Sequence, residues 1–248
     1  MLRSIDSIDW GGVANKISED PVKKKGKDRI RVRYVNQLNS KTFSRIVDTY
    51  QLDTKRVCDV GCGYGEMLFH FGEGSMGITI PGEEKDVMDV IGLHSVVANI
   101  EEDDLKEYAG QFDVVYCCGV IEHLFSPNLA IRKMRMLLKD GGLLILGVPV
   151  ITTPAFLTRL KKFRGAFAQA HINFFTFSTF PNFVKEADCQ IEAVRSFYFG
   201  NRFLDALFAP VIPQCYVVAR KNGQYKENET KRKEKSAYTK TELYFEKG

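Results

Sequence analysis

Residues 57–66, VCDVGCGYGE, hold three glycines within five positions, directly after a short apolar run. Glycine lacks a Cβ atom, so it adopts positive φ angles and lets a ligand approach the backbone closely. An apolar run that ends in such a turn is typical of the first strand of an open α/β sheet, whose carboxyl edge binds ligands. The turn therefore predicts a parallel sheet with a binding site above its first strand.

The segments around this turn alternate between continuous apolar runs and apolar residues at helical spacing. Parallel neighbouring strands need crossover connections, and strands buried on both faces appear as continuous apolar runs. The pattern therefore predicts an α/β fold with a doubly wound sheet. We expect its strands at 55–61, 75–80, 94–100, 112–118 and 143–149, and its helices at 66–71, 83–91, 102–109 and 127–138. A helix near 177–187 and a hairpin-like edge, made by strands in 189–199 and 214–220, complete the expected elements.

One main domain, residues 28–220, is expected between two terminal segments of different character. Residues 1–27 combine glycines with a run of lysines, which predicts a flexible arm. Apolar residues at spacings of three and four predict a helix over 28–50. Residues 151–172, rich in Lys, Arg and Phe, are expected to form an irregular insertion and a substrate lid. Residues 221–248 mix both charge signs with few aliphatic residues, which predicts a disordered tail.

Composition excludes several classes of protein. The chain has 248 residues, a net charge of +4 and 44% hydrophobic residues, which fits a globular protein with a sizeable core. The small positive excess does not indicate a dedicated nucleic-acid-binding protein, although it permits an anionic substrate. The six cysteines form no CxxC pair, the N-terminus lacks a signal-peptide core, and no apolar stretch is long enough to span a bilayer. We therefore expect a cytoplasmic protein without a membrane span.

The spacing of the glycines separates two classes of nucleotide-like ligand. A nicotinamide dinucleotide site needs the pattern G-x-G-x-x-G, with an acid about 20 residues further on. Here Gly61, Gly63 and Gly65 are preceded by Asp59 inside the strand end, which departs from that pattern. An oxidoreductase is accordingly the least favoured interpretation.

Two stretches resemble the class I S-adenosylmethionine-dependent methyltransferases. VCDVGCGYGEMLFHF is similar to the first motif of that family, and FDVVYCCGVIEHLFSPNLAIRKMRMLLKDGGLLILGVP is similar to its block from the fourth to the fifth strand. The resemblance implies a Rossmann-like, seven-stranded mixed sheet. It also implies S-adenosyl-L-methionine as the cofactor and S-adenosyl-L-homocysteine as the product.

The same resemblance implies which residues hold the cofactor. Asp59 would lie near the amino-acid moiety, and Thr79 stands where the family usually has an acid for the ribose. A hydroxyl makes one hydrogen bond where a carboxylate accepts two, so affinity is expected to fall by ~1–3 kcal/mol unless Glu83 or Glu84 compensates. The full expected set is Asp59, Gly61, Cys62, Gly63, Thr79, Asn99, Ile100 and Cys118.

Methyl transfer from a sulfonium is an in-line displacement, so positioning of the acceptor supplies most of the catalysis. A hydroxyl acceptor also benefits from a general base or a metal. His171 is the first candidate for the base, because an imidazole titrates near neutral pH, followed by Glu122 and His123. Each also has a purely structural interpretation: His171 as a core or capping residue, Glu122 as a helix N-terminal charge, and His123 as a packing residue.

Two further resemblances bear on the acceptor. The motif VIEHL is similar to that of the methyltransferases that act on the 2′-hydroxyl at the 3′ ends of small RNAs, but Gly119 replaces one acidic metal ligand of that family, so no metal is predicted. The stretch AHINFFTFSTFPNFVKEADCQIEAV resembles methyltransferases of bacterial sugars and other hydroxylated small molecules. We therefore expect O-methylation of a small or sugar-like substrate. The alternatives are an RNA 2′-O-methyltransferase and a non-catalytic binding module.

Overall fold

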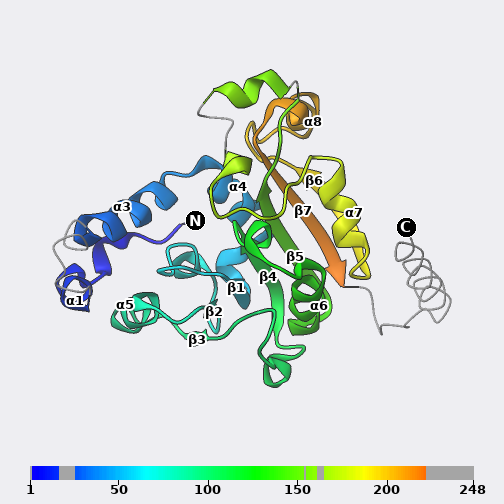
Figure 1. Ribbon diagram of the computed structural model, residues 1–248. Coiled ribbons are helices and arrows are strands. Elements are labelled where there is room, and N and C mark those ends of the chain that lie inside the picture. The colour runs from blue at the N-terminus through cyan, green and yellow to red at the C-terminus, as the bar shows by residue number, and fades with distance from the viewer. Residues whose placement is uncertain (1, 17–25, 154, 161–164, 222–248) are drawn as a thin grey trace, which may run out of the picture.

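A single mixed sheet with helices on both faces forms the molecule (Figure 1). The computed structural model describes residues 2–16, 26–153, 155–160 and 165–221. The sheet has seven strands in the order β3-β2-β1-β4-β5-β7-β6. The strands are β1 (Val57–Val60), β2 (Met76–Thr79), β3 (Ser95–Val97), β4 (Phe112–Cys118), β5 (Leu138–Pro149), β6 (Cys189–Arg195) and β7 (Gln214–Lys221).

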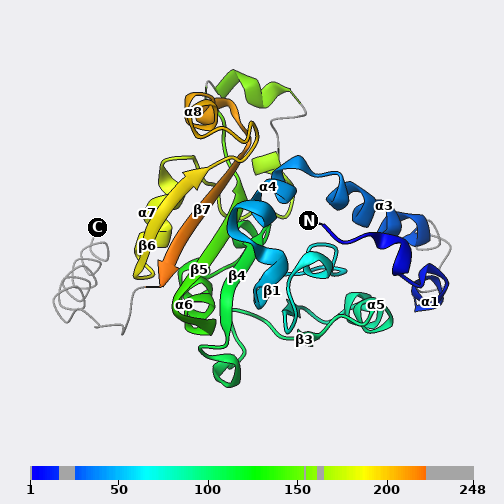
Figure 2. The same cartoon turned by 180° about the vertical axis from the view of Figure 1, so that it is seen from behind.

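The direction of the strands confirms the predicted fold class. Strands β3, β2, β1, β4 and β5 pair in parallel, whereas β7 runs antiparallel to both β5 and β6. The pair β6 and β7 forms the expected hairpin-like edge, which Figure 2 shows from behind. Strand order reverses at β1, which lies between β2 and β4, and ligands of open α/β sheets bind at such a switch point.

The helices cover both faces of the sheet, because alternate side chains of a strand point to opposite sides. Val114 and Tyr116 of β4 belong to a buried cluster with Phe43, whereas Val115 of the same strand belongs to a second cluster with Ile131. The α-helices are α1 (Trp10–Lys16), α3 (Gly26–Leu38), α4 (Lys41–Tyr50), α5 (Glu83–Ile91), α6 (Pro127–Leu137), α7 (Thr179–Lys185) and α8 (Arg202–Leu207).

Three expected helices differ from the observed ones. The helix expected over 28–50 is two helices, because the Ser40 hydroxyl accepts a hydrogen bond from the Phe43 amide at 3.3 Å and begins α4 anew. The helix expected over 66–71 is only the 3-10 turn Leu68–His70, since the chain must bend again at Gly72, whose backbone packs against Lys55.

The third difference lies at 102–109, where the structure has the 3-10 turn Lys106–Tyr108. Asp104 accepts a hydrogen bond from the Lys106 amide at 3.0 Å and so starts that turn. Four consecutive acids, residues 101–104, precede it, and like charges on one helical turn oppose an earlier start.

The first residues of the chain pack against the domain where a flexible arm was expected. Ile5, Ile8 and Val13 are buried in a cluster with Tyr34 of α3 and Val87 of α5. Residues 17–25 of the expected arm and 222–248 of the expected tail lie outside the described residues. Helices α1 and α3 therefore lie over the part of the sheet that carries the glycine-rich turn.

The insertion, residues 151–172, leaves and rejoins the sheet at neighbouring points. A β-bridge pairs Val150 with Phe175, and the Ile151 amide donates to the Phe175 carbonyl at 2.8 Å. The described parts of the insertion contain two short 3-10 segments, Ala155–Arg159 and Gly165–Phe167. No helix among the described residues is long and apolar enough to cross a membrane.

Candidate functional site: a glycine-rich cradle and a Glu-His-His cluster

The turn after β1 (GCGYG) needs its glycines for two separate reasons. Gly61, Gly63 and Gly65 have φ angles of 75°, 55° and 84°, which side-chain-bearing residues rarely adopt. A Cβ atom on Gly61 would lie 2.2 Å from the Val120 Cγ2, and one on Gly65 would lie 2.5 Å from the Leu93 Cδ1. The turn is therefore both left-handed and tightly enclosed.

Hydrogen bonds to β2 hold the turn in place. The amides of Gly61 and Cys62 both donate to the Ile78 carbonyl, at 2.8 and 3.1 Å. The Cys62 side chain is buried, with its Sγ 3.6 Å from the Met88 Sδ. Of the expected cofactor residues, Cys62 can therefore offer a ligand its backbone only.

Two buried acids flank the turn without complete hydrogen bonding. Asp59, at the end of β1, and Glu66, just beyond the turn, are 3% and 7% exposed. The Asp59 Oδ2 and the Glu66 Oε2 are buried and have no hydrogen-bond partner. Burial, together with the nearby charge of Glu66, raises the pKa of the Asp59 carboxyl well above its ordinary value. A cationic ligand would supply the missing partner for these oxygens.

We call the glycine turn, Asp59 and Glu66 together the cradle. Helix α3 adds residues to it that the sequence analysis did not assign. The Arg33 Nε donates to the Glu66 Oε1 at 2.6 Å, and its guanidinium lies 5.3 Å from the centre of the Tyr64 ring. Its Nη2 would lie 3.3 Å from a Cβ on Gly63, which places a cation beside the turn. The Tyr34 hydroxyl donates to the Tyr64 carbonyl at 2.8 Å. The only sequence signal for Arg33 was its place in a basic helix that precedes the turn.

The end of β2 offers an acid other than the residue at the expected position. Thr79 is buried, and its hydroxyl is 3.4 Å from the Ile80 carbonyl. The Tyr64 hydroxyl donates to the Glu83 Oε1 at 2.7 Å, and the Glu83 Oε2 is buried without a hydrogen-bond partner. Glu84 instead points its Oε2 to within 2.1 Å of where a Cβ on Gly82 would lie. Of the two acids considered from sequence, Glu83 is the one that reaches the glycine turn.

The remaining expected cofactor residues lie at the ends of β3 and β4. The Asn99 Oδ1 accepts from the Glu101 amide at 2.9 Å, and Ile100 is 5% exposed in the core. The Cys118 Sγ lies 3.6 Å from the Tyr216 hydroxyl of β7, and burial raises the pKa of this thiol to about 11. The Asn99 amide oxygen is therefore already used in a local turn, and Cys118 contacts the β7 side of the sheet.

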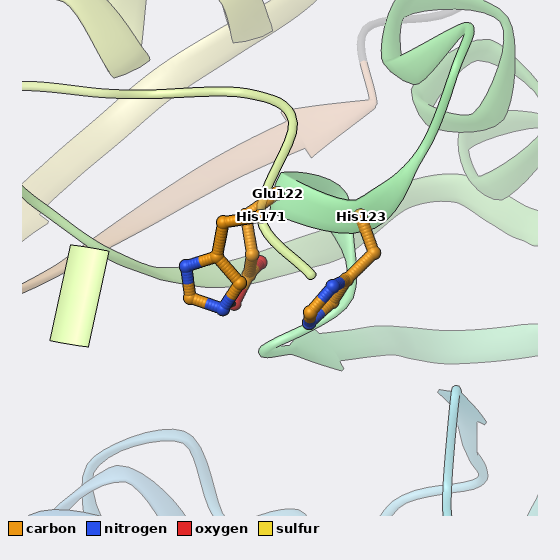
Figure 3. Close-up of side chains that lie close together, drawn as sticks. All are labelled: Glu122, His123 and His171. Atoms are coloured by element: carbon orange, nitrogen blue, oxygen red, sulfur yellow. Dashed lines mark ion pairs between the residues drawn. The ribbon is translucent and has the colours of Figure 1, made fainter. Parts of the chain in front are cut away.

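Glu122, His123 and His171 come together although 48 positions separate His123 from His171 (Figure 3). Glu122 and His123 lie in the 3-10 turn Ile121–His123 after β4, and His171 ends the structured part of the insertion. The His171 Nε2 is 3.9 Å from the Glu122 Oε1, and the two imidazole centres are 4.6 Å apart. The three candidate bases named from sequence thus lie together in space.

Backbone carbonyls determine which nitrogen of each imidazole carries a proton. The Nδ1 of His123 is 2.9 Å from the Ala170 carbonyl, and the Nδ1 of His171 is 3.1 Å from the Ala166 carbonyl. A carbonyl oxygen only accepts hydrogen bonds, so each Nδ1 carries the hydrogen and each neutral ring keeps a lone pair on Nε2. The cluster therefore presents two basic nitrogens beside a carboxylate.

Burial also affects Glu122. Its side chain is 3% exposed, and its Oε2 has no hydrogen-bond partner. Burial raises the pKa of this carboxyl, while its backbone amide and the neighbouring histidines act in the opposite direction. Glu122, His123 and His171 can each direct one ligand atom to a common point, since these atoms lie within 4.8 Å of one another. The cluster can thus share a proton or hold a divalent cation.

The cluster adjoins the glycine cradle. Val120, which touches Gly61, lies two positions before Glu122 in the loop after β4. On the other side, the amides of Ile172 and Asn173 donate to the Glu122 carbonyl at 2.9 and 3.0 Å. The insertion, the cluster and the cradle therefore share one edge of the sheet.

Comparison with known proteins identifies the family. Residues 31–194, more than half of the chain, match the model of the methyltransferase domain. The chain belongs to this family. The resemblance of its two motifs implied the same family.

Curated relatives include O-methyltransferases. The chain is 34% identical over 109 residues to the ubiquinone biosynthesis O-methyltransferase of Xanthomonas axonopodis pv. citri, covering 41% of this chain and 46% of that protein. It is 34% identical over 98 residues to the enzyme of the same name from Escherichia coli, covering 36% and 40%. The matched stretch thus spans less than half the length of these two relatives.

Solved structures agree with the fold. A TehB-like S-adenosylmethionine-dependent methyltransferase from Corynebacterium glutamicum superimposes with a TM-score of 0.54 and 16% identity, covering 79% of this chain and 97% of that one. The residues around the glycine turn fit a cationic cofactor such as S-adenosylmethionine, since the buried oxygens of Asp59 and Glu66 have no hydrogen-bond partner.

We predict opposite effects of Asp59→Asn on stability and on cofactor binding. The native state holds the Asp59 proton to higher pH than the unfolded chain does, so the unfolding free energy of the wild type falls as pH rises above the ordinary carboxyl pKa. Removal of this buried carboxyl should weaken that dependence and raise the Tm at neutral pH by about 2–4 °C, for a gain of about 1 kcal/mol. Affinity for S-adenosylmethionine should fall, because an amide does not balance a cation.

Thermal unfolding at several pH values and calorimetric titration of S-adenosylmethionine measure the two effects. Asp140→Asn, which alters an exposed acid near the start of β5, is the matched control and should change neither. Unchanged affinity in Asp59→Asn would contradict the assignment of this residue to the cofactor.

We also predict that Glu83→Gln lowers cofactor affinity about tenfold, through the loss of one charge-assisted hydrogen bond. Glu84→Gln should leave the affinity unchanged, because Glu84 does not contact the turn as Glu83 does through Tyr64. Calorimetric titration of both variants compares them directly. Equal losses in the two variants would mean that cofactor affinity depends on the overall negative charge at the start of α5 and not on the position of Glu83.

Proposed function

We propose that the protein is an S-adenosylmethionine-dependent methyltransferase that methylates a hydroxyl oxygen of a small or sugar-like molecule. The observation that carries the proposal is the pair of imidazoles whose Nδ1 atoms face carbonyls, leaving basic Nε2 atoms beside the buried Glu122. A hydroxyl is protonated at neutral pH, so a positioned base assists its attack. The names of the matched relatives, which are O-methyltransferases, support the same class of reaction.

In this proposal the cradle binds the cofactor, which when bound supplies an electrophilic methyl group on a sulfonium. Asp59 and Glu66 provide carboxylate oxygens for its positive charges. Arg33 provides a guanidinium for its carboxylate, and Glu83 an acid for its ribose. The backbone of the glycine turn, at Gly61, Cys62 and Gly63, lies beneath, and the ends of β3 and β4, with Asn99, Ile100 and Cys118, bound the site.

His171 is the residue to which we assign the base. Its Nε2 takes the hydroxyl proton, while the Ala166 carbonyl holds the Nδ1 hydrogen and so orients the ring. The resulting imidazolium faces the Glu122 carboxylate at 3.9 Å, which stabilises the positive charge. His123, held by the Ala170 carbonyl, is the second candidate because its ring lies beside that of His171.

A cavity between the insertion and the α8 region has a size that suits a small acceptor. It has a volume of about 390 Å³, within the range of small-molecule sites. Its lining is mostly apolar with several hydroxyl groups: Ile151, Thr153, Thr176, Phe177, Ser178, Ala206, Ala209 and Pro210. Its walls come from the start of the insertion, the segment after His171 and the region of α8. The insertion was expected from sequence to form a substrate lid.

We infer a reducing compartment, such as the cytoplasm, from the state of the cysteines. All six are free, and five of them are buried. Burial raises the thiol pKa at each of these positions, for example to about 11 at Cys189, which keeps them protonated and unreactive.

We predict that His171→Asn lowers kcat by about 10²–10⁴-fold, because it removes the base. Calorimetric affinity for S-adenosylmethionine should remain that of the wild type, since His171 lies outside the cradle. His94→Asn, which changes an exposed histidine after α5, is the matched control and should keep full activity. Methyl transfer from radiolabelled cofactor to a panel of hydroxylated small molecules supplies the assay. A His171→Asn variant with wild-type kcat would rule out this residue as the base.

The convergence of Glu122, His123 and His171 also favours a second candidate, metal-assisted methylation of a hydroxyl, which includes the 2′-hydroxyl of RNA. For the proton-acceptor mechanism we predict that activity survives EDTA treatment. Loss of activity with EDTA and its return with Mg²⁺ or Mn²⁺ would instead establish the metal-assisted mechanism.

For an RNA acceptor, binding of a short RNA should weaken steeply as salt rises, whereas binding of a neutral small acceptor should not.

A further inference from the structure

Exposed aromatic side chains are concentrated in one part of the described chain. Among all the residues that the structure describes, every exposed aromatic side chain except that of Phe125 lies between residues 156 and 208. We define the apolar surface by six residues of the insertion and the α8 region: Phe156, Leu160, Phe199, Phe203, Leu207 and Phe208. Large exposed apolar patches on a folded protein mark sites of contact with another apolar phase or molecule.

Helix α8 has the reverse of the usual amphipathic arrangement. Asp205 points inward and is 1% exposed, while Phe203 and Leu207, one turn apart, are 72% and 59% exposed. The buried acid accepts hydrogen bonds from the Ser196 hydroxyl at 2.9 Å and the Phe199 amide at 3.0 Å. These polar contacts anchor the helix so that its apolar face points away from the protein. In water alone this orientation is unfavourable, because the apolar side chains of Phe203 and Leu207 stay exposed to solvent.

The two segments of the apolar surface lie side by side. The Thr153 amide donates to the Pro210 carbonyl at 2.7 Å, which joins the insertion to the end of the α8 region. The rings of Phe199 and Phe208 are 5.1 Å apart. In both Figure 1 and Figure 2, the segment 155–159 and α8 project together from the same end of the molecule.

The charges around this surface are positive. Arg159 and Arg202 are exposed on its two segments. The sequence of the insertion contains no Asp or Glu, and in residues 196–212 the only acid is Asp205. Asp205 is buried and paired with Arg195 at 3.3 Å, so it contributes no exposed negative charge. Aromatic and aliphatic side chains among exposed cations are the combination that binds anionic lipid surfaces.

We propose that the apolar surface docks on an anionic membrane surface, with Phe203 and Leu207 entering the interface between headgroups and acyl chains. A protein partner would also cover apolar residues, but the described residues of these two segments include no exposed acid, and Arg159 and Arg202 complement a negatively charged surface. Docking in this way turns the edge of the sheet that carries the insertion and His171 toward the membrane. The proposal does not depend on which hydroxyl is methylated.

Flotation of the full chain with vesicles tests the proposal. Wild-type protein should float with vesicles of phosphatidylglycerol mixed with phosphatidylcholine, and much less with phosphatidylcholine alone. The double variant Phe203→Ser, Leu207→Ser should bind the anionic vesicles at least about tenfold more weakly, because it removes the inserting side chains. The matched control changes two exposed aliphatic residues elsewhere, Val32→Ser with Leu129→Ser, and should bind as the wild type does.

Three results would overturn the proposal. The first is absence of wild-type binding to anionic vesicles. The second is equal binding by wild type and the Phe203, Leu207 variant, which would assign the lipid contact to other basic parts of the chain. The third is a dimer in solution that the same variant dissociates while vesicle binding is absent, since a second copy would then cover the surface. Unfolding temperatures equal to that of the wild type confirm that the variants are folded.

Discussion

The contact between Gly61 and Val120 is the constraint on which the site depends. It presses the turn after β1 against the loop after β4 so closely that a single methyl group on Gly61 would collide with the valine. The first loop is the one that we propose to hold the cofactor, and the second carries Glu122 and His123 two and three positions after Val120. The contact therefore fixes the separation between the proposed cofactor site and the Glu-His-His cluster, and an in-line displacement requires such fixed positioning.

Sequence predicted the parts of this arrangement that depend on local pattern. The strands were predictable because buried parallel strands are continuous apolar runs, and the glycine turn because positive φ angles have few alternatives. The short turn at 68–70 was predicted wrongly as a helix, since its termination depends on Gly72 packing against Lys55, a contact that no local pattern encodes. The break at Ser40 was missed, because one capping residue interrupts an otherwise helical pattern.

The site was predicted only in part from sequence, because several of its residues are oriented by partners that lie far away in the chain. Residue types alone named Glu122, His123 and His171, but the positions of their protons depend on the carbonyls of Ala166 and Ala170, which any residue would provide. Arg33 was not assigned to the site, because its partner Glu66 lies 33 positions away. Chemically distinctive side chains can thus be recognised before folding is known, whereas the backbone groups that orient them cannot.

The insertion, residues 151–172, both orients the two imidazoles and lines the cavity, so a change in it affects both. Its backbone carbonyls orient both imidazoles, and its first residues line the cavity that we propose for the acceptor. A change in this segment that fits a new acceptor would therefore also move the hydrogen-bond acceptors that set which nitrogen of each ring is basic. Divergence of the chain toward new substrates is accordingly expected to proceed through side chains that line the cavity from α8 and the segment around Thr176, where replacement leaves the Ala166 and Ala170 carbonyls in place.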